Sequence, residues 1–109
     1  MESSLEKKQR VNLLMDCYED LLTEKQREYL SYYYDEDLSL SEIAEELDVS
    51  RNAVYDNLKR AVNALEDYEN KLHLLQKHIE RMKLIDSIEE MQNETNETMN
   101  NYLEMLRNI

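Results

Sequence analysis

Residues 22–65 read LTEKQREYLSYYYDEDLSLSEIAEELDVSRNAVYDNLKRAVNAL, and this stretch decides the fold of the chain. Two amphipathic segments in it are joined by residues 48–50, a connection of the length found between the two helices of a helix-turn-helix. Ser39 and Glu42 form a capping-box pair that opens the first segment, and Ser50 is placed to cap the second. The stretch therefore predicts a helix-turn-helix motif whose second helix begins near Arg51.

Apolar residues in both segments recur at helical spacing, which predicts one buried face for each helix. At the turn, Asp48 occupies a position that more often carries Gly, although Asp tolerates left-handed backbone better than most residues. Val49 is expected to fill the hinge. The predicted core positions are Ile43, Ala44, Leu47, Val54, Leu58, Ala61, Val62 and Leu65.

The other side of the second helix is left for solvent or a ligand, and in DNA-binding motifs this helix enters the major groove. Arg pairs well with guanine and Asn with adenine, whereas the acidic Asp56 disfavours phosphate. The candidate nucleic-acid-binding residues are Arg51, Asn52, Tyr55, Lys59 and Arg60.

The chain of 109 residues contains no Gly and no Pro, and no run alternates as a strand would, so an all-α fold is expected. We expect a helix-turn-helix domain over residues 1–65 and a long helix continuing over 66–92. A polar linker and a short terminal helix should follow over 93–109. Ser3 with Glu6, and Thr23 with Gln26, are expected to cap the first two helices.

The predicted long helix carries a heptad-like seam, which indicates packing against another helix. The partner is either an element of the same chain or the same helix of a second copy. We favour a homodimer, because so small a domain offers the far end of the helix no partner. The seam residues are Leu65, Tyr68, Leu72, Leu75, Ile79 and Met82.

Charge opposes strong binding to duplex DNA, because the net charge is −12 and phosphate contacts supply most non-specific affinity. Eight acids and no Lys or Arg lie between Glu28 and Ser50. The recognition helix is locally basic, with three cations against one acid over residues 51–60. A second basic stretch spans residues 71–83. Any nucleic-acid contact is therefore expected to have a small footprint.

Residues 22–65 resemble region four of bacterial sigma factors, and residues 1 to about 90 are similar to the YlxM family of small helix-turn-helix proteins from Gram-positive bacteria. Two runs carry this likeness, NLLMDCYEDLLTEKQREYLSYYYDEDLSLSEIA over 12–44 and VSRNAVYDNLKRA over 49–61. The resemblance implies a regulatory adaptor of the signal recognition particle pathway, with the particle's RNA or its GTPase as partner. A DNA-binding transcriptional regulator and a protein-interaction module using the acidic surface are the alternatives.

The remaining residues indicate a cytoplasmic protein without catalysis. No run approaches the ~20 apolar residues that span a membrane, so no membrane insertion is expected, and the single Cys17 suits a reducing compartment. A Gly-rich phosphate loop is impossible without Gly, and the two His residues stand alone, so neither an enzyme, a cofactor nor a metal site is expected. Tyr29 and Tyr33 should pack in the core, leaving Tyr32 and Tyr34 for solvent or unpaired bases.

Overall fold

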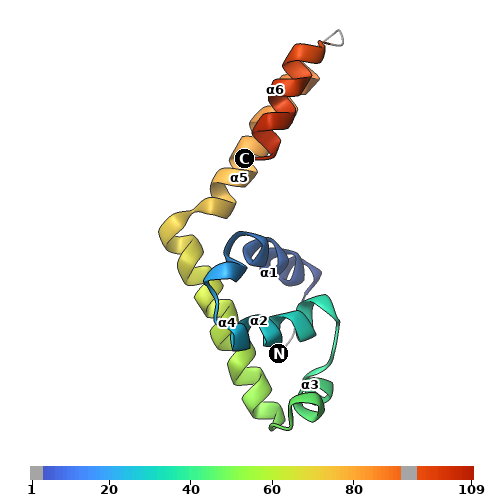
Figure 1. Cartoon of the computed structure of the whole chain (residues 1–109), viewed down its shortest axis with the longest axis vertical. Helices are drawn as coiled ribbons and strands as arrows, with labels where there is room; N and C mark the ends of the chain where they lie inside the picture. The colour runs from blue at the N-terminus through green and yellow to red at the C-terminus, as the bar shows by residue number, and fades with distance from the viewer. Residues whose placement is uncertain (1–3, 92–95) are drawn as a thin grey trace. The chain divides into compact units, whose positions relative to one another are not determined.

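The computed structural model describes residues 4–91 and 96–109, and every regular element in them is helical (Figure 1), which confirms the all-α prediction. The chain divides into two compact units at His73, called here the N-terminal unit and the C-terminal unit. The elements are α1 (Leu5–Tyr18), η1 (Glu19–Leu21), α2 (Glu24–Leu30), η2 (Ser31–Asp35), α3 (Leu40–Leu47), α4 (Arg51–Leu72), α5 (Leu74–Glu90) and α6 (Glu97–Arg107).

The helix caps of the N-terminal unit follow the sequence closely. At the start of α3 the Ser39 Oγ accepts a hydrogen bond from the Glu42 backbone N–H at 3.1 Å, and the Glu42 Oε1 accepts one from the Ser39 backbone N–H at 3.0 Å. Hydrogen bonding from Ser39, chiefly from its backbone N–H, lowers the pKa of the Glu42 carboxyl. Thr23 and Gln26 form the same box on α2, and Ser50 caps α4. These caps confirm three predicted helix starts.

One cap lies a residue later than expected. The Ser4 Oγ accepts a hydrogen bond from the Lys7 backbone N–H at 3.1 Å, so Ser4 opens α1, and Ser3 lies outside the described residues. Neighbouring serines offer equivalent hydroxyls, and sequence alone does not determine which of the two has extended backbone angles.

The turn between α3 and α4 reverses the chain without glycine. Asp48 has φ 53° and ψ 50°, the left-handed conformation expected at this position. The Val49 backbone N–H donates to the Ala44 carbonyl at 3.0 Å, which satisfies one of the free carbonyls at the end of α3. The side chain of Val49 is exposed, so the prediction that it fills the hinge was wrong.

Helix α4 is the centre of the N-terminal unit, and α1, α2 and α3 all pack against it. Its inward stripe lies at successive i, i+4, i+7 and i+11 positions, each fully excluded from solvent. The stripe consists of Val54, Leu58, Ala61 and Leu65. Ile43 is also fully buried, whereas Ala44, Leu47 and Val62 are half-buried at the margin of the predicted core.

The burial of Tyr33 and Tyr34 differs from the prediction because the helix widens over the tyrosine run, residues 32–34. In η2 the Glu36 backbone N–H donates to the Ser31 carbonyl five residues back, so the run is a π turn rather than a continuation of α2. The extra residue rotates the side chains that follow. Tyr34 is consequently buried at 6% exposure and Tyr33 is half-buried with its ring edge against Tyr34, the reverse of the expected order.

A buried polar contact ties the last part of α4 to α1. The Tyr18 hydroxyl donates to the Glu69 Oε1 at 2.5 Å, and both side chains are shielded from solvent. The ring of Tyr18 also stacks on Tyr68, with ring centroids 5.9 Å apart. A buried carboxylate is tolerated only with such partners, so Tyr18 fixes where the end of α4 lies on α1.

The long helix expected over residues 66–92 is broken. Helix α4 ends at Leu72, and His73 takes left-handed angles of φ 57° and ψ 28°. A single residue in this conformation ends the helical hydrogen-bond ladder. The predicted seam is therefore interrupted at His73; of its residues, Leu65 and Leu75 are buried, whereas Leu72 and Ile79 are exposed.

The C-terminal unit is a helical hairpin in which α6 runs back along α5 (Figure 1). Among its described residues Leu75, Ile85 and Leu103 are the buried apolar side chains. Asn96 caps α6, so the segment 93–109, expected to begin with a polar linker, is helical from Glu97; residues 92–95 lie outside the described part.

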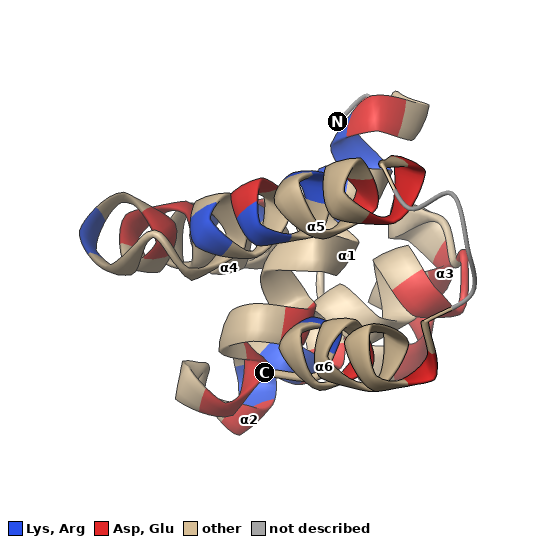
Figure 2. Cartoon of the chain, turned by 90° about the horizontal axis from the view of Figure 1, so that it is seen from above, with Lys and Arg blue, Asp and Glu red and all other residues tan. Residues whose placement is uncertain are grey.

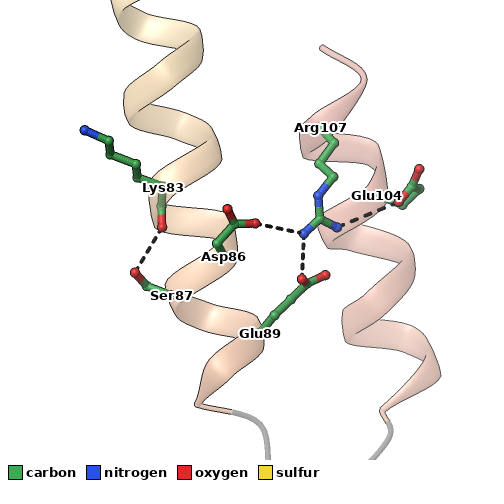
Figure 3. Close-up of polar contacts among 6 residues, drawn as sticks. All are labelled: Lys83, Asp86, Ser87, Glu89, Glu104 and Arg107. Atoms are coloured by element: carbon green, nitrogen blue, oxygen red, sulfur yellow. Dashed lines mark hydrogen bonds and ion pairs between the residues drawn. The ribbon is translucent and has the colours of Figure 1, made fainter.

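Arg107 ties the end of α6 to the last turns of α5. Its guanidinium lies 3.5 Å from Asp86 and 2.7 Å from Glu89 on α5, and 3.8 Å from Glu104 on its own helix. Figure 3 shows the four side chains together. The hydrogen bond to Glu89 is the largest cause that raises the pKa of Arg107. One cation therefore contacts two carboxylates on α5 and one on α6.

Apolar side chains remain exposed on α6 at i, i+3 and i+4, the spacing of one helix face, and exposed Ile109 follows just after the helix end. We call this set the α6 stripe; it consists of Tyr102, Met105, Leu106 and Ile109. In the described ranges no helix is long and apolar enough to cross a membrane.

We predict that Asp48→Gly stabilises the N-terminal unit by about 1 kcal/mol. Gly adopts left-handed backbone without the Cβ clash, and the change removes an acid from the negative end of the α3 dipole. Urea unfolding followed by circular dichroism measures the change. The control Glu45→Gly also removes one acid, but from the interior of α3, and should destabilise by about 0.5–1 kcal/mol. Equal effects of both variants would contradict the proposed cause.

Candidate nucleic-acid interface

The five residues predicted to bind nucleic acid are all exposed on α4. Tyr55 is the least exposed of them, at 36%. A helix held by a fully buried stripe presents its outward side chains on a rigid support. The arrangement therefore gives these five side chains fixed starting points along α4.

Two shallow hollows meet at Tyr55. The first, of about 180 Å³, lies at the start of α4 and is lined by Leu40, Arg51, Asn52 and Tyr55. It brings together three of the predicted site residues, with a guanidinium, an amide and an aromatic ring converging on the same space. These are the groups that pair with bases and stack on them.

The second hollow, of about 150 Å³, lies farther along α4 and is closed on one side by α1. Its lining residues are Lys7, Tyr55, Lys59, Val62 and Asn63. The four residues from α4 are spaced at i, i+4, i+7 and i+8, so they share a face. We call this space the α1–α4 hollow.

Sequence reasoning missed two residues of the α1–α4 hollow. Asn63 continues the helical spacing of Tyr55 and Lys59, so that spacing was the signal that could have identified it. Lys7 belongs to a different helix, and no pattern along the chain connects it with α4. Only the packing of α1 on α4 brings it to the site.

Arg60 does not share a hollow with the other four predicted site residues. It lies about 140° around the helix from Tyr55, in a separate, open hollow whose other lining residues include Glu66 and Asp67. Two acidic residues line the same hollow as Arg60, which makes this part of α4 less favourable for phosphate. Arg60 is therefore the weakest member of the predicted set.

Ion pairing distinguishes the basic residues of α1 from one another. The Lys8 Nζ contacts Asp37 at 2.6 Å, and Arg10 forms a two-pronged contact with Glu66 at 2.7 and 2.8 Å. Hydrogen bonds to these carboxylates raise the pKa of Lys8 and of Arg10.

Unlike Lys8 and Arg10, the cations that line the two hollows form no ion pairs within the described part of the chain. Within the described part of the chain, no carboxylate lies within 4.0 Å of the charged groups of Lys7, Arg51 or Lys59. Their charge is therefore available to an anionic ligand.

Helix α3 is the acidic neighbour of this surface. Glu42, Glu45 and Glu46 are exposed on it, and Figure 2 shows α3 with acidic segments and without a basic one. In DNA complexes of helix-turn-helix proteins the first helix of the motif crosses the phosphate backbone. Here that helix would bring carboxylates to the phosphates, which opposes docking along a duplex.

Cys17 offers no reactive alternative site. Its side chain is half-buried, and burial, followed by the charge of Glu69, raises the pKa of the thiol. A raised pKa keeps the group protonated and poorly nucleophilic. In the described ranges no three His, Cys, Asp or Glu side chains converge as metal ligands.

Comparison with known proteins identifies relatives along nearly the whole chain. Residues 5–105 match the model of the family UPF0122, described as "Putative helix-turn-helix protein, YlxM / p13 like", which confirms the resemblance inferred from the sequence. UPF0122 proteins from Bacillus mycoides (strain KBAB4), Bacillus thuringiensis (strain Al Hakam) and Bacillus anthracis (strain A0248) are each 52% identical over 108 residues. Each alignment covers 96% of this chain and 98% of the relative.

We predict that the outward and inward sides of α4 respond differently to truncation. Asn52→Ala and Lys59→Ala should change the free energy of unfolding by no more than about 0.5 kcal/mol, because both side chains are exposed. Leu58→Ala should cost about 2–5 kcal/mol, because it opens a cavity in the core. Urea unfolding measures all three variants. A large loss from either exposed position would mean that it supports the fold rather than a ligand.

Proposed function

Because the chain belongs to the UPF0122 family of YlxM-like helix-turn-helix proteins, we propose that its N-terminal unit binds nucleic acid and that the protein is a regulatory adaptor of the signal recognition particle pathway. The likeness to the YlxM family supports the pathway, and the surface of α4 supports the type of ligand. The partner is the particle's RNA, with its GTPase as a further contact. This role places the protein in the cytoplasm.

The observation that carries the proposal is the set of cations around Tyr55 that have no carboxylate within 4.0 Å among the residues that the structure describes. Lys7, Arg51 and Lys59 keep their charge available although the chain as a whole is strongly acidic. At physiological ionic strength charges farther than about 8 Å are largely screened. A small basic site can therefore bind phosphate locally in spite of the net charge of −12.

A DNA-binding transcriptional regulator is the second candidate function. Arg51 and Asn52 occupy the first turn of the recognition helix, where DNA-binding motifs contact base edges. The acids of α3 weigh against this function, since a duplex presents phosphates to both helices of the motif. A folded RNA can instead present a short segment to α4 alone.

The test is a double charge reversal, Arg51→Glu with Lys59→Glu, measured by fluorescence anisotropy against the RNA of the particle and against mixed-sequence duplex DNA. We expect the RNA affinity to fall at least roughly tenfold, because two phosphate contacts become repulsive. The matched control, Lys25→Glu with Arg27→Glu, makes the same change in net charge on the exposed side of α2. It should leave the affinity within about threefold.

Three results would contradict the RNA proposal. Equal losses in both double variants would indicate an unlocalised charge effect. Preference for duplex DNA would favour the regulator. Absence of binding to either nucleic acid would leave a protein-interaction role for the acidic surface.

We also propose that two copies associate through the α6 stripe. A helical hairpin of fewer than about 40 residues buries too little apolar surface to be stable alone, and oligomerisation is a common remedy. The described part of the hairpin buries three apolar side chains, whereas Tyr102, Met105 and Ile109 are each more than 60% exposed. A second hairpin offers the same stripe in return, and two hairpins make a four-helix bundle.

Light scattering coupled to size exclusion should give twice the chain mass for the wild type. The variant Tyr102→Glu with Met105→Glu should be monomeric, because it places charges in the middle of the stripe. The control Asn100→Glu with Asn108→Glu adds the same charge away from the stripe and should remain dimeric. A monomeric wild type at every concentration tested would overturn the dimer.

A further inference from the structure

We propose that the α1–α4 hollow is a binding site for one unpaired nucleotide of a folded RNA, an inference that rests on the proposed RNA-binding function. In this site Tyr55 stacks on the base, Asn63 hydrogen-bonds the base edge, and Lys7 and Lys59 bind the flanking phosphates. Helix α1, which is outside the helix-turn-helix motif, thereby becomes part of the recognition surface.

The lining of the hollow has the composition that such a nucleotide requires. Proteins recognise unpaired bases by stacking them on aromatic rings and by hydrogen-bonding their edges. Tyr55 supplies an accessible ring, Val62 a half-buried apolar floor, and Asn63 an amide with both donors and an acceptor. The two ammonium groups approach from different helices, so they can contact phosphates on either side of the base.

The geometry of RNA excludes the usual docking of a recognition helix. A-form RNA has a deep, narrow major groove that side chains cannot read, so sequence is read in loops, bulges and ends. Helix α4 would therefore contact an RNA partner at a loop, bulge or end, where bases are unpaired. The α1–α4 hollow lies beyond the first turn of α4, and part of its wall comes from a second helix.

The distribution of charge favours one strand over two. Lys7 and Lys59 line the α1–α4 hollow, whereas α3 is acidic and the hollow that contains Arg60 is also lined by Glu66 and Asp67. A single strand crossing the α1–α4 hollow meets Lys7 and Lys59 and needs no contact with α3. A duplex would place its second backbone against carboxylates.

The experiment uses the full-length protein and three labelled RNA probes: a stem with an eight-nucleotide loop, the same stem closed as a blunt duplex, and the loop sequence alone. Anisotropy titrations compare the wild type with Tyr55→Phe, Tyr55→Ser, Lys7→Gln and Lys8→Gln. Circular dichroism confirms that each variant is folded. Lys8→Gln is the matched control, because Lys8 adjoins Lys7 in sequence while its charge is held by Asp37.

We expect the wild type to bind the loop probe at least roughly tenfold more tightly than the blunt duplex. Tyr55→Phe should retain this preference, and Tyr55→Ser should lose roughly tenfold in loop affinity, because the stacking ring is removed. Lys7→Gln should weaken loop binding and reduce the slope of log affinity against log salt by roughly 0.7, the value for one single-strand phosphate contact. Lys8→Gln should leave that slope unchanged.

The possible outcomes distinguish failure of the proposed nucleotide site from failure of the proposed RNA-binding function. Equal binding of loop and duplex, with no effect of Tyr55→Ser, would overturn the nucleotide site while RNA binding stands. Equal effects of Lys7→Gln and Lys8→Gln would remove α1 from the surface and overturn the site in this form. Absence of binding to all three RNAs would overturn the proposed function itself.

Discussion

The packing of the inward stripe of α4 is the interaction on which the rest of the N-terminal unit depends. Its four side chains are fully buried, and α1, α2 and α3 are each positioned by packing against this helix. Because the inward positions are fixed by packing, the outward positions of the same helix are fixed as well. The turn at Asp48, the π turn of η2 and the buried bond between Tyr18 and Glu69 all adapt the chain to that helix.

A chain without glycine must place other residues in left-handed backbone. It does so at Asp37, Asp48 and His73, each at a junction where an element ends or begins. Asp and His are among the non-glycine residues enriched in this region, because a short polar side chain offsets part of the steric cost. The left-handed backbone at His73, which made the end of α4 difficult to anticipate, thus has a simple local cause.

The helix-turn-helix and its caps could be predicted because they depend on residues within a few positions of one another. Ser39 with Glu42, the stripe from Val54 to Leu65 and the outward side of α4 are such local features. The break at His73 was missed because one residue with left-handed backbone angles ends the helix, and the burial of Tyr34 was missed because the π turn of η2 shifts the helical register. Lys7 was missed for another reason: its place depends on contacts between helices far apart in the chain.

The bond between Tyr18 and Glu69 also bears on how the unit folds. It joins positions 51 residues apart, whereas α2 and α3 reach α4 through much shorter connections. Closing a longer loop costs more chain entropy, and contacts of long sequence separation slow folding. Docking of α1 is therefore the natural late step, after α2, α3 and α4 have assembled. With no proline in the chain, no prolyl isomerisation lasting tens of seconds delays it, and the hollow that α1 completes is closed only when that step has finished.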